Sequence, residues 1–343
     1  RSAAKTEREK GTYFERLCIA FLQNDPIQAQ QYSEVQTFAE WAKQHGEAAK
    51  DTGIDLVAKL RDEDGYAAIQ CKFYAPHYQV QKKDIDSFLS TSSRSPFVRR
   101  VVIDTTDVDW SNNADATIAK QSIPVVRIGL SSLRLSAIDW AAYETLDQVK
   151  LKSKKSLLQH QQQAVEKVLQ GFKESDRGKL IMACGTGKTF TALRIAEKLA
   201  GTGKRVLVLV PSLALIAQTV REWTNDAEVR LRSFAVCSDS QVGKRRISNN
   251  DIAEIEAHEL DFPATTNAHK LYEHASLTDN ERMTVCFSTY QSIPVITAAQ
   301  QAGLQAFDLV ICDEAHRTTG AKIEGEEDSN FVRVHENKHV NAL

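Results

Sequence analysis

The spacing of apolar residues in the first part of the chain predicts a small α/β domain. Apolar side chains recur at helical spacing over residues 6–23 and predict a helix there. Two apolar runs, Ile54–Leu60 and Tyr66–Phe73, predict strands joined by the polar turn Arg61–Gly65. The pattern then predicts, in order, a helix near 81–89, a strand over 98–103, a helix near 114–120, a strand over 125–128 and a helix near 131–143.

A second domain follows a charged segment without apolar periodicity. We assign residues 1–148 to the first domain, 149–156 to a linker and 157–343 to the second domain. Strands alternate with helices in the second domain, which predicts a parallel sheet with helices on both faces. A polar stretch at about 238–280 is expected to be an insertion, partly loop. The predicted elements are helices over 161–169, 189–200 and 213–224 and strands over 180–182, 205–210, 285–288 and 309–312.

The composition is that of an ordinary soluble protein, with 42% hydrophobic and 26% charged residues. No stretch approaches the roughly 20 apolar residues of a membrane helix, so we expect no membrane association. The charged start of the chain has no apolar core and is not a secretory signal. Six scattered cysteines form no CxxC pair, which favours buried, reduced thiols over disulfides or zinc ligands.

A net charge of −2 excludes a wholly basic nucleic-acid binder. Any DNA contact must therefore come from local basic patches and backbone amides. Taken alone, each basic run is more typical of a solvated charged face. The candidate patches are Arg94 with Arg99 and Arg100, then Lys150 with Lys152, Lys154 and Lys155, and then Lys244 with Arg245 and Arg246.

The segment Ala183-Cys-Gly-Thr-Gly-Lys-Thr189 lies between a predicted strand and a predicted helix, which is the context that phosphate binding needs. Gly185 and Gly187 allow the backbone to curl so that its N–H groups face phosphate oxygens, and the helix N-terminus adds its dipole. Lys188 can reach the β- and γ-phosphates, and the Thr189 hydroxyl can ligate Mg²⁺. An alanine stands where the general pattern has its first glycine. The segment predicts an ATP site.

A pair of acids at the end of an apolar strand supplies the second half of this site. The strand in Val310-Ile-Cys-Asp-Glu-Ala-His316 delivers Asp313 to its C-terminal end, where it can hold Mg²⁺. Glu314 can polarise the attacking water. Two buried carboxylates are costly unless a cation or a proton compensates them, so this pair indicates a metal–nucleotide site.

These two motifs together resemble the first RecA-like domain of a superfamily 2 helicase or translocase. Leu158–Ala164 resembles the adenine-reading segment of that family, with Gln161 as the reader because an amide both donates and accepts. The resemblance implies a nucleotide site made of Gln161, Gly185, Thr186, Gly187, Lys188, Thr189, Asp313 and His316.

Two further segments resemble the DNA-backbone motifs of the same family, although each alone is more typical of an ordinary strand-to-helix turn. Val210-Pro-Ser-Leu213 resembles the first motif, and Ser288-Thr-Tyr-Gln-Ser292 resembles the second. The resemblance implies sequence-blind DNA contacts by Ser212, Thr289 and Gln291. The family's Ser/Thr-Ala-Thr loop and second RecA-like domain do not appear, so we expect a longer polypeptide.

The predicted strand hairpin of the first domain carries a second candidate site. Period-two alternation places Gln70 and Lys72 on one face, and antiparallel pairing can bring Asp55 beside them. Asp55, the Gln70 side-chain oxygen and the Cys71 carbonyl could bind Mg²⁺. Lys72 could orient water or stabilise the transition state at phosphorus. Alone, glutamine and lysine on an amphipathic strand are more often a solvated face.

This pattern resembles the PD-(D/E)xK nucleases, and within them the Mrr-like branch, which has glutamine where others have glutamate. The segment Gly11-Thr-Tyr-Phe-Glu15 also resembles that branch and implies Glu15 as an additional acid at the metal site. The glutamine leaves this metal site with one negative ligand fewer than the acidic form of the motif has.

The chain as a whole resembles the N-terminal part of the Type ISP, single-polypeptide, ATP-dependent restriction-modification enzymes. The resemblance implies a bacterial cytoplasmic enzyme that translocates on double-stranded DNA and cleaves it with ATP and Mg²⁺. It also implies a methyltransferase using S-adenosylmethionine, a target-recognition domain and possible pairing with a second enzyme copy. The alternatives are a Type I restriction motor subunit, a DNA-binding module, and a repair helicase with a degenerate nuclease.

Overall fold

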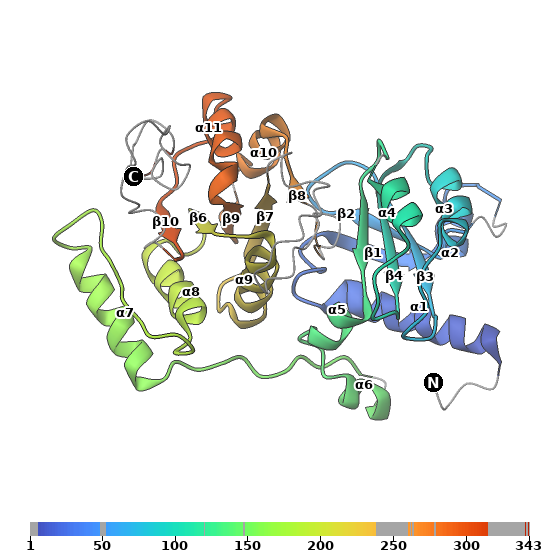
Figure 1. Cartoon of the computed structure of the whole chain (residues 1–343), viewed down its shortest axis with the longest axis horizontal. Helices are drawn as coiled ribbons and strands as arrows, with labels where there is room; N and C mark the ends of the chain where they lie inside the picture. Colours follow the sequence, from blue (N-terminus) through green and yellow to red (C-terminus); the bar gives the residue numbers. More distant parts are fainter. Residues whose placement is uncertain are drawn as a thin grey trace. The chain divides into compact units, whose positions relative to one another are not determined.

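The computed structural model describes residues 6–48, 53–119, 121–146, 148–237, 260, 262, 264–277, 279–314, 340 and 342 (Figure 1). The chain divides into two compact units. The first comprises Arg1–Lys152 and His258–Pro263, and the second comprises Ser153–Ala257 and Ala264–Leu343. The division falls within the residues that we assign to the linker.

The first unit is built on a five-stranded mixed sheet with strand order β1-β2-β3-β4-β5. The strand β2 runs antiparallel to β1 and β3, whereas β3, β4 and β5 run parallel. The elements are α1 (Glu7–Asn24), β1 (Tyr32–Thr37), α2 (Phe38–Gln44), β2 (Leu56–Leu60), β3 (Tyr66–Lys72), η1 (Lys82–Asp84), α3 (Asp86–Thr91), β4 (Phe97–Asp104), α4 (Asn112–Ile118), β5 (Val125–Ile128), α5 (Leu130–Leu135) and α6 (Trp140–Leu146).

Two cores cover the two faces of this sheet, because side chains alternate along each strand. In β3, Ala67 and Ile69 join the core beneath α1, whereas Ala68 joins the core beneath α2, α3 and α4. The helix α1 starts with a capping box between Thr6 and Glu9. Helices therefore cover both faces of the sheet, and the candidate site residues lie near the ends of its strands.

Two features of the first unit differ from the sequence expectation. Strand β1 and helix α2 were not predicted, and the helix expected near 131–143 is two short helices. Ser136 leaves the helix with extended backbone, and its hydroxyl donates to Asp25 Oδ2 at 2.7 Å. The same hydroxyl oxygen accepts from the Ile138 amide, which a continuous helix would have bonded to a backbone carbonyl.

The second unit is built on an all-parallel sheet with strand order β10-β6-β9-β7-β8. In Figure 1, α10 and α11 lie on one side of this sheet and α8 and α9 on the other, which confirms the predicted α/β layering. The elements are α7 (Gln159–Gly171), α8 (Lys188–Leu199), β6 (Arg205–Val210), α9 (Leu213–Asp226), β7 (Leu231–Val236), β8 (Ala264–Thr265), α10 (Ala268–Ala275), β9 (Met283–Thr289), η4 (Tyr290–Ser292), α11 (Ile293–Gln301) and β10 (Leu309–Cys312).

The strand expected over residues 180–182 is absent. These residues have no regular structure, and Ile181 is 83% exposed. A short strand needs a neighbour that takes up its backbone hydrogen bonds, and none of the described strands pairs with residues 180–182.

Sequence analysis also missed β7, α10 and α11. Within the range 238–280, β8 and α10 belong to this domain, with Leu271 and Ala275 buried in its core, whereas residues 238–259 lie outside the described part.

The six cysteines are free thiols in this structure. Cys18, Cys237 and Cys286 are buried, whereas Cys184 is exposed beside the glycine-rich turn. Among the described residues, no helix is both long and apolar enough to cross a membrane.

Candidate functional site

The glycine-rich turn has the left-handed backbone that its sequence indicates. Gly185 and Gly187 have φ angles of +76° and +79°, and α8 begins directly after Gly187. A Cβ atom on Gly187 would lie 2.4 Å from Gln161 Nε2, whereas a Cβ on Gly185 would meet nothing within 4 Å. The loop therefore needs glycine for conformation at both positions and for space at Gly187. Its open side is at Gly185.

Gln161 holds this loop from the side of α7. Its Nε2 donates to the Thr186 carbonyl at 2.9 Å, and its Oε1 accepts from the Leu158 amide at 2.9 Å. The ring of His160 contacts the same carbonyl at 3.2 Å, and the Thr186 hydroxyl donates to Ala183 O. Both ends of the Gln161 amide therefore have partners within the protein, one in the loop and one at the start of α7, and reading adenine would require an exchange of partners.

The acidic turn after β10 lies against the first residue of α8. Lys188 Nζ is 3.2 Å from Glu314 Oε1, and this hydrogen bond is the main cause that raises the pKa of Lys188. Glu314 has a φ angle of +51°, a left-handed conformation that costs a residue with a side chain roughly 1–2 kcal/mol. The structure thus brings Lys188, Asp313 and Glu314 together, as the motifs predict. His316 lies outside the described residues.

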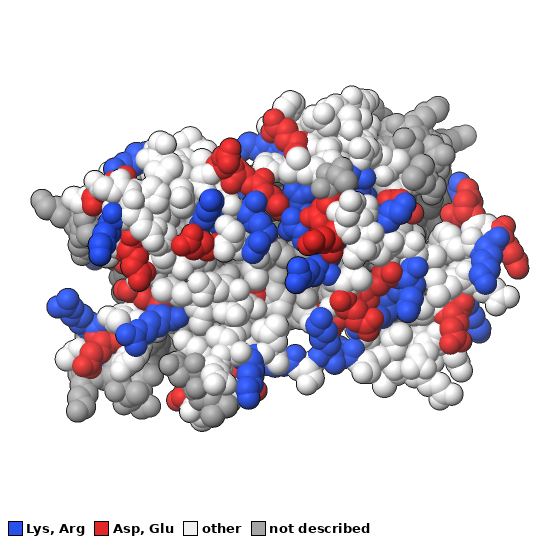
Figure 2. Space-filling view, turned by 180° about the vertical axis from the view of Figure 1, so that it is seen from behind, with Lys and Arg blue, Asp and Glu red and all other residues white. Residues whose placement is uncertain are grey.

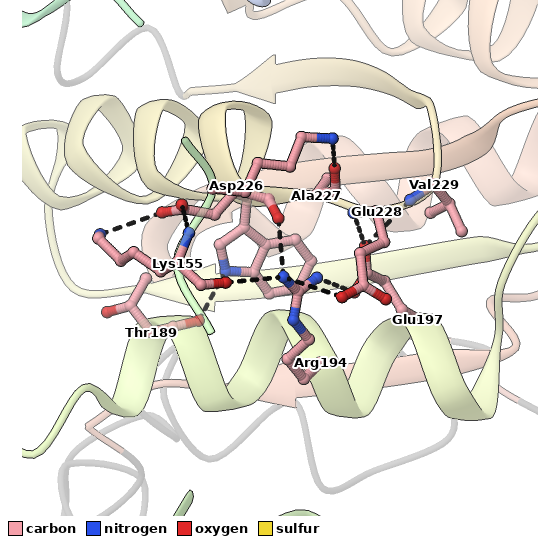
Figure 3. A network of polar contacts seen from close by, with 10 residues as sticks. Lys155, Thr189, Arg194, Glu197, Asp226, Ala227, Glu228 and Val229 are labelled. Atoms are coloured by element: carbon pink, nitrogen blue, oxygen red, sulfur yellow. Dashed lines mark hydrogen bonds and ion pairs between the residues drawn. The ribbon is translucent and has the colours of Figure 1, made fainter. Parts of the chain in front are cut away.

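A buried polar network fixes α8 behind the loop (Figure 3). Arg194 is 4% exposed, ion-pairs with Glu197 and donates to the Asp226 carbonyl at 3.0 Å. The Asp226 carboxylate accepts from the backbone amide of Lys155 at 2.9 Å and pairs with its ammonium at 3.0 Å. At the start of the helix, the Trp223 indole donates to Thr189 O at 3.0 Å. The helix that presents Lys188 and Thr189 is thereby tied to α9 along its length.

The three candidate DNA contacts lie at the C-terminal ends of β6 and β9: Ser212 follows β6, Thr289 ends β9 and Gln291 follows it. Ser212 caps α9 by accepting from the Leu215 amide at 3.3 Å. The Thr289 hydroxyl is fully buried and lies 2.8 Å from that of Ser292, so the structure does not present it to a DNA strand. Gln291 Oε1 is buried and has no hydrogen-bond partner among the described residues.

The nuclease candidates meet at one end of the β2–β3 pair. The Asp55 amide donates to Ile69 O at 2.9 Å, and the Cys71 amide donates to Asp55 Oδ2 at 2.7 Å. Lys72 is half-buried at the end of β3. The antiparallel register that the hairpin pattern predicts is thus present, and it sets the Asp55 carboxylate against the backbone of the Gln70–Lys72 segment.

The oxygen atoms of this group fit a divalent cation. Gln70 is 3% exposed, its Nε2 donates to Gly53 O at 3.0 Å, and its Oε1 has no hydrogen-bond partner among the described residues. Glu15 has a raised pKa, first because of burial and then because of the charge of Asp55. A buried orphan oxygen and two mutually repelling carboxylates are the groups that a hard cation satisfies. No described cluster of three or more His, Cys, Asp or Glu side chains could hold a metal, so the amide and backbone oxygens are needed to complete this set.

The Cys71 side chain contacts Cys18 of α1. Burial raises the pKa of the Cys71 thiol, and contact with Cys18 raises it further. The thiol therefore stays protonated at neutral pH, and only the Cys71 carbonyl remains as the metal ligand that the sequence suggested.

Most of the basic candidates for DNA binding are committed to partners within the protein. Arg94 pairs with Glu47, and Arg99 pairs with Glu63 at 3.1 Å. Arg100 is 1% exposed and donates to Leu89 O. On the face that Figure 2 presents, Lys and Arg are interspersed with Asp and Glu. Lys152 and Lys154 donate to the carbonyls of Ser136 and Ala227, Lys155 pairs with Asp226, and Lys244, Arg245 and Arg246 lie outside the described residues.

Sequence reasoning missed several residues that shape the ATP site. Trp223 and Arg194 lie in α9 and α8 and have no motif signature, because their bonds reach residues more than 30 positions away. Tyr290 sits within the motif Ser288–Ser292 and donates its hydroxyl to the Asp313 carbonyl at 2.7 Å. In the sequence, this bond was indicated only by the position of Tyr290 between the predicted DNA contacts Thr289 and Gln291.

Comparison with known proteins gives two family matches. Residues 23–150 match the family described as restriction endonuclease, and residues 154–340 match the family described as Type III restriction enzyme, res subunit. The second match covers more than half of the chain. A comparison with curated proteins finds no match.

The solved structures that are similar to this chain include two Type ISP enzymes. The ATP-dependent Type ISP restriction-modification enzyme LlaBIII bound to DNA is 40% identical over 98% of the chain, with a TM-score of 0.81. A nuclease-deletion mutant of the Type ISP enzyme LlaGI, in complex with a DNA substrate mimic, is 41% identical over 55% of the chain and 17% of its own length, with a TM-score of 0.42. The chain spans 21% of the length of LlaBIII.

Proposed function

Because the chain belongs to the family of the Type III restriction enzyme res subunit through residues 154–340, we propose that it is the nuclease and first motor domain of an ATP-dependent restriction enzyme acting on double-stranded DNA. The observation that carries the proposal is the 3.2 Å contact between Lys188 and Glu314, which joins the two motifs of the proposed ATP site. The same chain also holds the nuclease candidates Asp55 and Gln70. The proposal names two sites with separate chemistry.

At the motor site, the exposed amides at Gly185 and the N-terminus of α8 bind the phosphates. Lys188 exchanges its partner Glu314 for the β- and γ-phosphates, which frees the Glu314 carboxylate to position the attacking water. Thr189 and Asp313 would hold Mg²⁺, which neutralises charge that develops on the phosphate oxygens. Ser212 and Gln291 contact one DNA strand at the same sheet edge.

At the nuclease site, Asp55, Gln70 Oε1 and the Cys71 carbonyl would hold Mg²⁺, with Glu15 as an additional acid. Mg²⁺ there supplies a Lewis acid for the scissile phosphate. Lys72 orients the water or stabilises the negative charge that develops at phosphorus. Glutamine provides a neutral oxygen, so the carboxylates of Asp55 and Glu15 provide the negative charge of the site.

The remaining functions of the whole enzyme belong to the proposal as well. LlaBIII is a restriction-modification enzyme and is much longer than this chain. We therefore assign a second RecA-like domain, a target-recognition domain and a methyltransferase using S-adenosylmethionine to further parts of the polypeptide. Cleavage of both strands would engage a second enzyme copy. A cytoplasmic location agrees with six free thiols.

The test uses the full-length polypeptide on supercoiled plasmid DNA that lacks or carries the protecting methylation. ATP- and Mg²⁺-dependent cleavage of unmethylated plasmid, accompanied by DNA-stimulated ATP hydrolysis, is the expected result. Cleavage that proceeds equally without ATP would contradict the restriction-motor proposal, and ATP hydrolysis without any nicking would contradict the nuclease assignment. Equal cleavage of both plasmids would contradict the assignment to restriction.

A further inference from the structure

Three neighbouring strands of the second unit end at the same edge of the sheet. The order β10-β6-β9 is parallel, with Thr289 beside Val210 and Cys312 beside Leu209 in register. The segment that follows β9 holds the predicted DNA contact Gln291, and the segment that follows β10 holds Asp313. The DNA-contacting segment and the acidic turn are therefore two strands apart (Figure 1).

Tyr290 bridges these two segments. It follows β9 directly, is fully buried, and packs in the core formed with Leu207 and Leu209 of β6. Its hydroxyl donates to the Asp313 carbonyl at 2.7 Å. Adjacent strands lie about 4.8 Å apart, so the side chain and its hydrogen bond together bridge the two strand intervals between the ends of β9 and β10.

The bond from Tyr290 completes a clamp on one peptide group. The carbonyl of the Asp313–Glu314 peptide accepts from Tyr290, and the N–H of the same peptide donates to Asp313 Oδ1 at 2.9 Å. Glu314, the residue that follows, has the left-handed φ angle of +51°. A residue with a side chain rarely adopts this conformation, so the clamped peptide helps to hold the backbone from which the Glu314 side chain reaches Lys188.

The other end of Tyr290 is fixed by the turn that contains it. The hydroxyls of Thr289 and Ser292 lie 2.8 Å apart on either side of Tyr290 and Gln291. A displacement of this turn by a DNA strand therefore moves the Tyr290 hydroxyl, and with it the clamped peptide.

We propose that Tyr290 is a positioning residue that couples DNA contact at the turn Tyr290–Ser292 to the orientation of Glu314. The inference rests on the proposed motor function and deepens it. Tyr290 touches neither the DNA nor the nucleotide in this role. It makes the catalytic orientation of Glu314 conditional on DNA, and DNA-stimulated ATP hydrolysis follows from that condition.

The experiment compares Tyr290→Phe with Tyr272→Phe in the full-length polypeptide. Tyr290→Phe keeps the buried ring and removes only the hydroxyl. Tyr272 is the matched control, because it packs against the same core from α10. One measurement is the ratio of ATP hydrolysis rates with and without DNA. The other is the ratio of DNA dissociation constants with and without a non-hydrolysable ATP analogue, which reports coupling without turnover.

Wild type is expected to show coupling of about fivefold or more in the binding ratio. Tyr290→Phe should bring that ratio close to one and reduce DNA stimulation about tenfold to 100-fold, while KM for ATP changes less than about twofold. Ser292→Ala should weaken coupling in part, and should add nothing in the Tyr290→Phe background. Tyr272→Phe should behave as wild type.

Unchanged coupling and stimulation in Tyr290→Phe, with the wild type stimulated by DNA, would overturn this inference alone. A wild-type enzyme without DNA stimulation would overturn the proposed motor function and the inference with it. Loss of coupling in Tyr272→Phe as well would also overturn the inference, because the effect would then come from the core rather than from the bond to Asp313.

Discussion

The Lys188 ammonium and the Glu314 carboxylate lie 3.2 Å apart, although their residues are 126 positions apart in the chain. Each side chain is about one-third exposed, so the pair is partly screened by solvent and can separate readily. In the proposed mechanism, phosphate and carboxylate compete for the same ammonium. The arrival of ATP would thus release Glu314 at the moment when a water must be positioned.

Glu314→Gln should separate ATP binding from ATP hydrolysis. The amide no longer competes as an anion for Lys188, so ATP affinity should be equal to or higher than that of wild type. Hydrolysis should fall about 10²–10⁴-fold, because an amide positions water but cannot accept a proton. Equilibrium binding of a fluorescent ATP analogue and single-turnover hydrolysis measure the two effects. Loss of binding together with turnover would contradict this role for Glu314.

Gln70→Glu should raise the affinity of the nuclease site for Mg²⁺. Gln70 Oε1 is buried without a partner among the described residues, so an added negative charge there has no competing donor. Without metal the variant should be less stable, because the new carboxylate replaces the donor that bonds Gly53 O. Calorimetric titration with Mg²⁺ tests this directly. Gln79→Glu, at an exposed position, is the control, and equal affinities for Gln70→Glu and wild type would remove Gln70 from the ligand set.

The raised pKa of Glu15 predicts that the stability of the metal-free protein depends on pH. Its pKa is raised by burial and by Asp55, so the folded state binds a proton more tightly than the unfolded chain. The resulting stabilisation is fully present below pH 4.5, the ordinary value, and is lost as pH rises through the folded pKa. Glu15→Gln should therefore raise the melting temperature at pH 7 and leave it nearly unchanged at pH 4. Mg²⁺ should remove the advantage at pH 7, and a variant less stable than wild type at pH 7 without metal would contradict the sign.

Arg194→Met should loosen α8 without touching the phosphate loop. Arg194 and Glu197 are each 5% exposed at their side chains, and removal of one partner of such a pair costs about 3 kcal/mol or more. The loss should be near the lower end, because Glu197 keeps the amides of Glu228 and Val229 as donors. Hydrogen exchange of the α8 amides measures this locally. Lys198→Met, at an exposed position of the same helix, should leave exchange unchanged.

The sequence predicted those parts of the structure whose cause is local. The turn at Gly185 and Gly187, the helix that follows and the contact of Asp55 with Cys71 each depend on neighbouring residues or on one hairpin. The strand expected over 180–182 depends on a partner strand, which no local pattern can supply. Strand β1 was missed because its buried residues Tyr32 and Val35 are three apart and break the alternation that marks a half-buried strand.

The same distinction applies to the candidate sites. The motifs named the residues that would touch ATP, Mg²⁺ and DNA, because each motif is contiguous. They did not indicate the contacts that orient those residues. The bond from Tyr290 to Asp313 spans 23 positions, and that from Trp223 to Thr189 spans 34. Only the folded sheet brings these partners together.

The last prediction tests whether the proposed nuclease site and the proposed ATP site act independently. Asp55→Ala should abolish DNA cleavage and leave ATP hydrolysis and translocation intact, because Asp55 and Lys188 belong to different compact units. Sites that share no side chains are usually close to independent. Lys188→Ala should abolish ATP hydrolysis and also cleavage, if translocation must bring two complexes together before the strands are cut. Nicking of supercoiled plasmid and ATP consumption, measured in parallel for both variants, give the four values required. Normal nicking by Asp55→Ala would remove the nuclease site from the proposal, whereas nicking by Lys188→Ala would leave both sites standing and remove only their coupling.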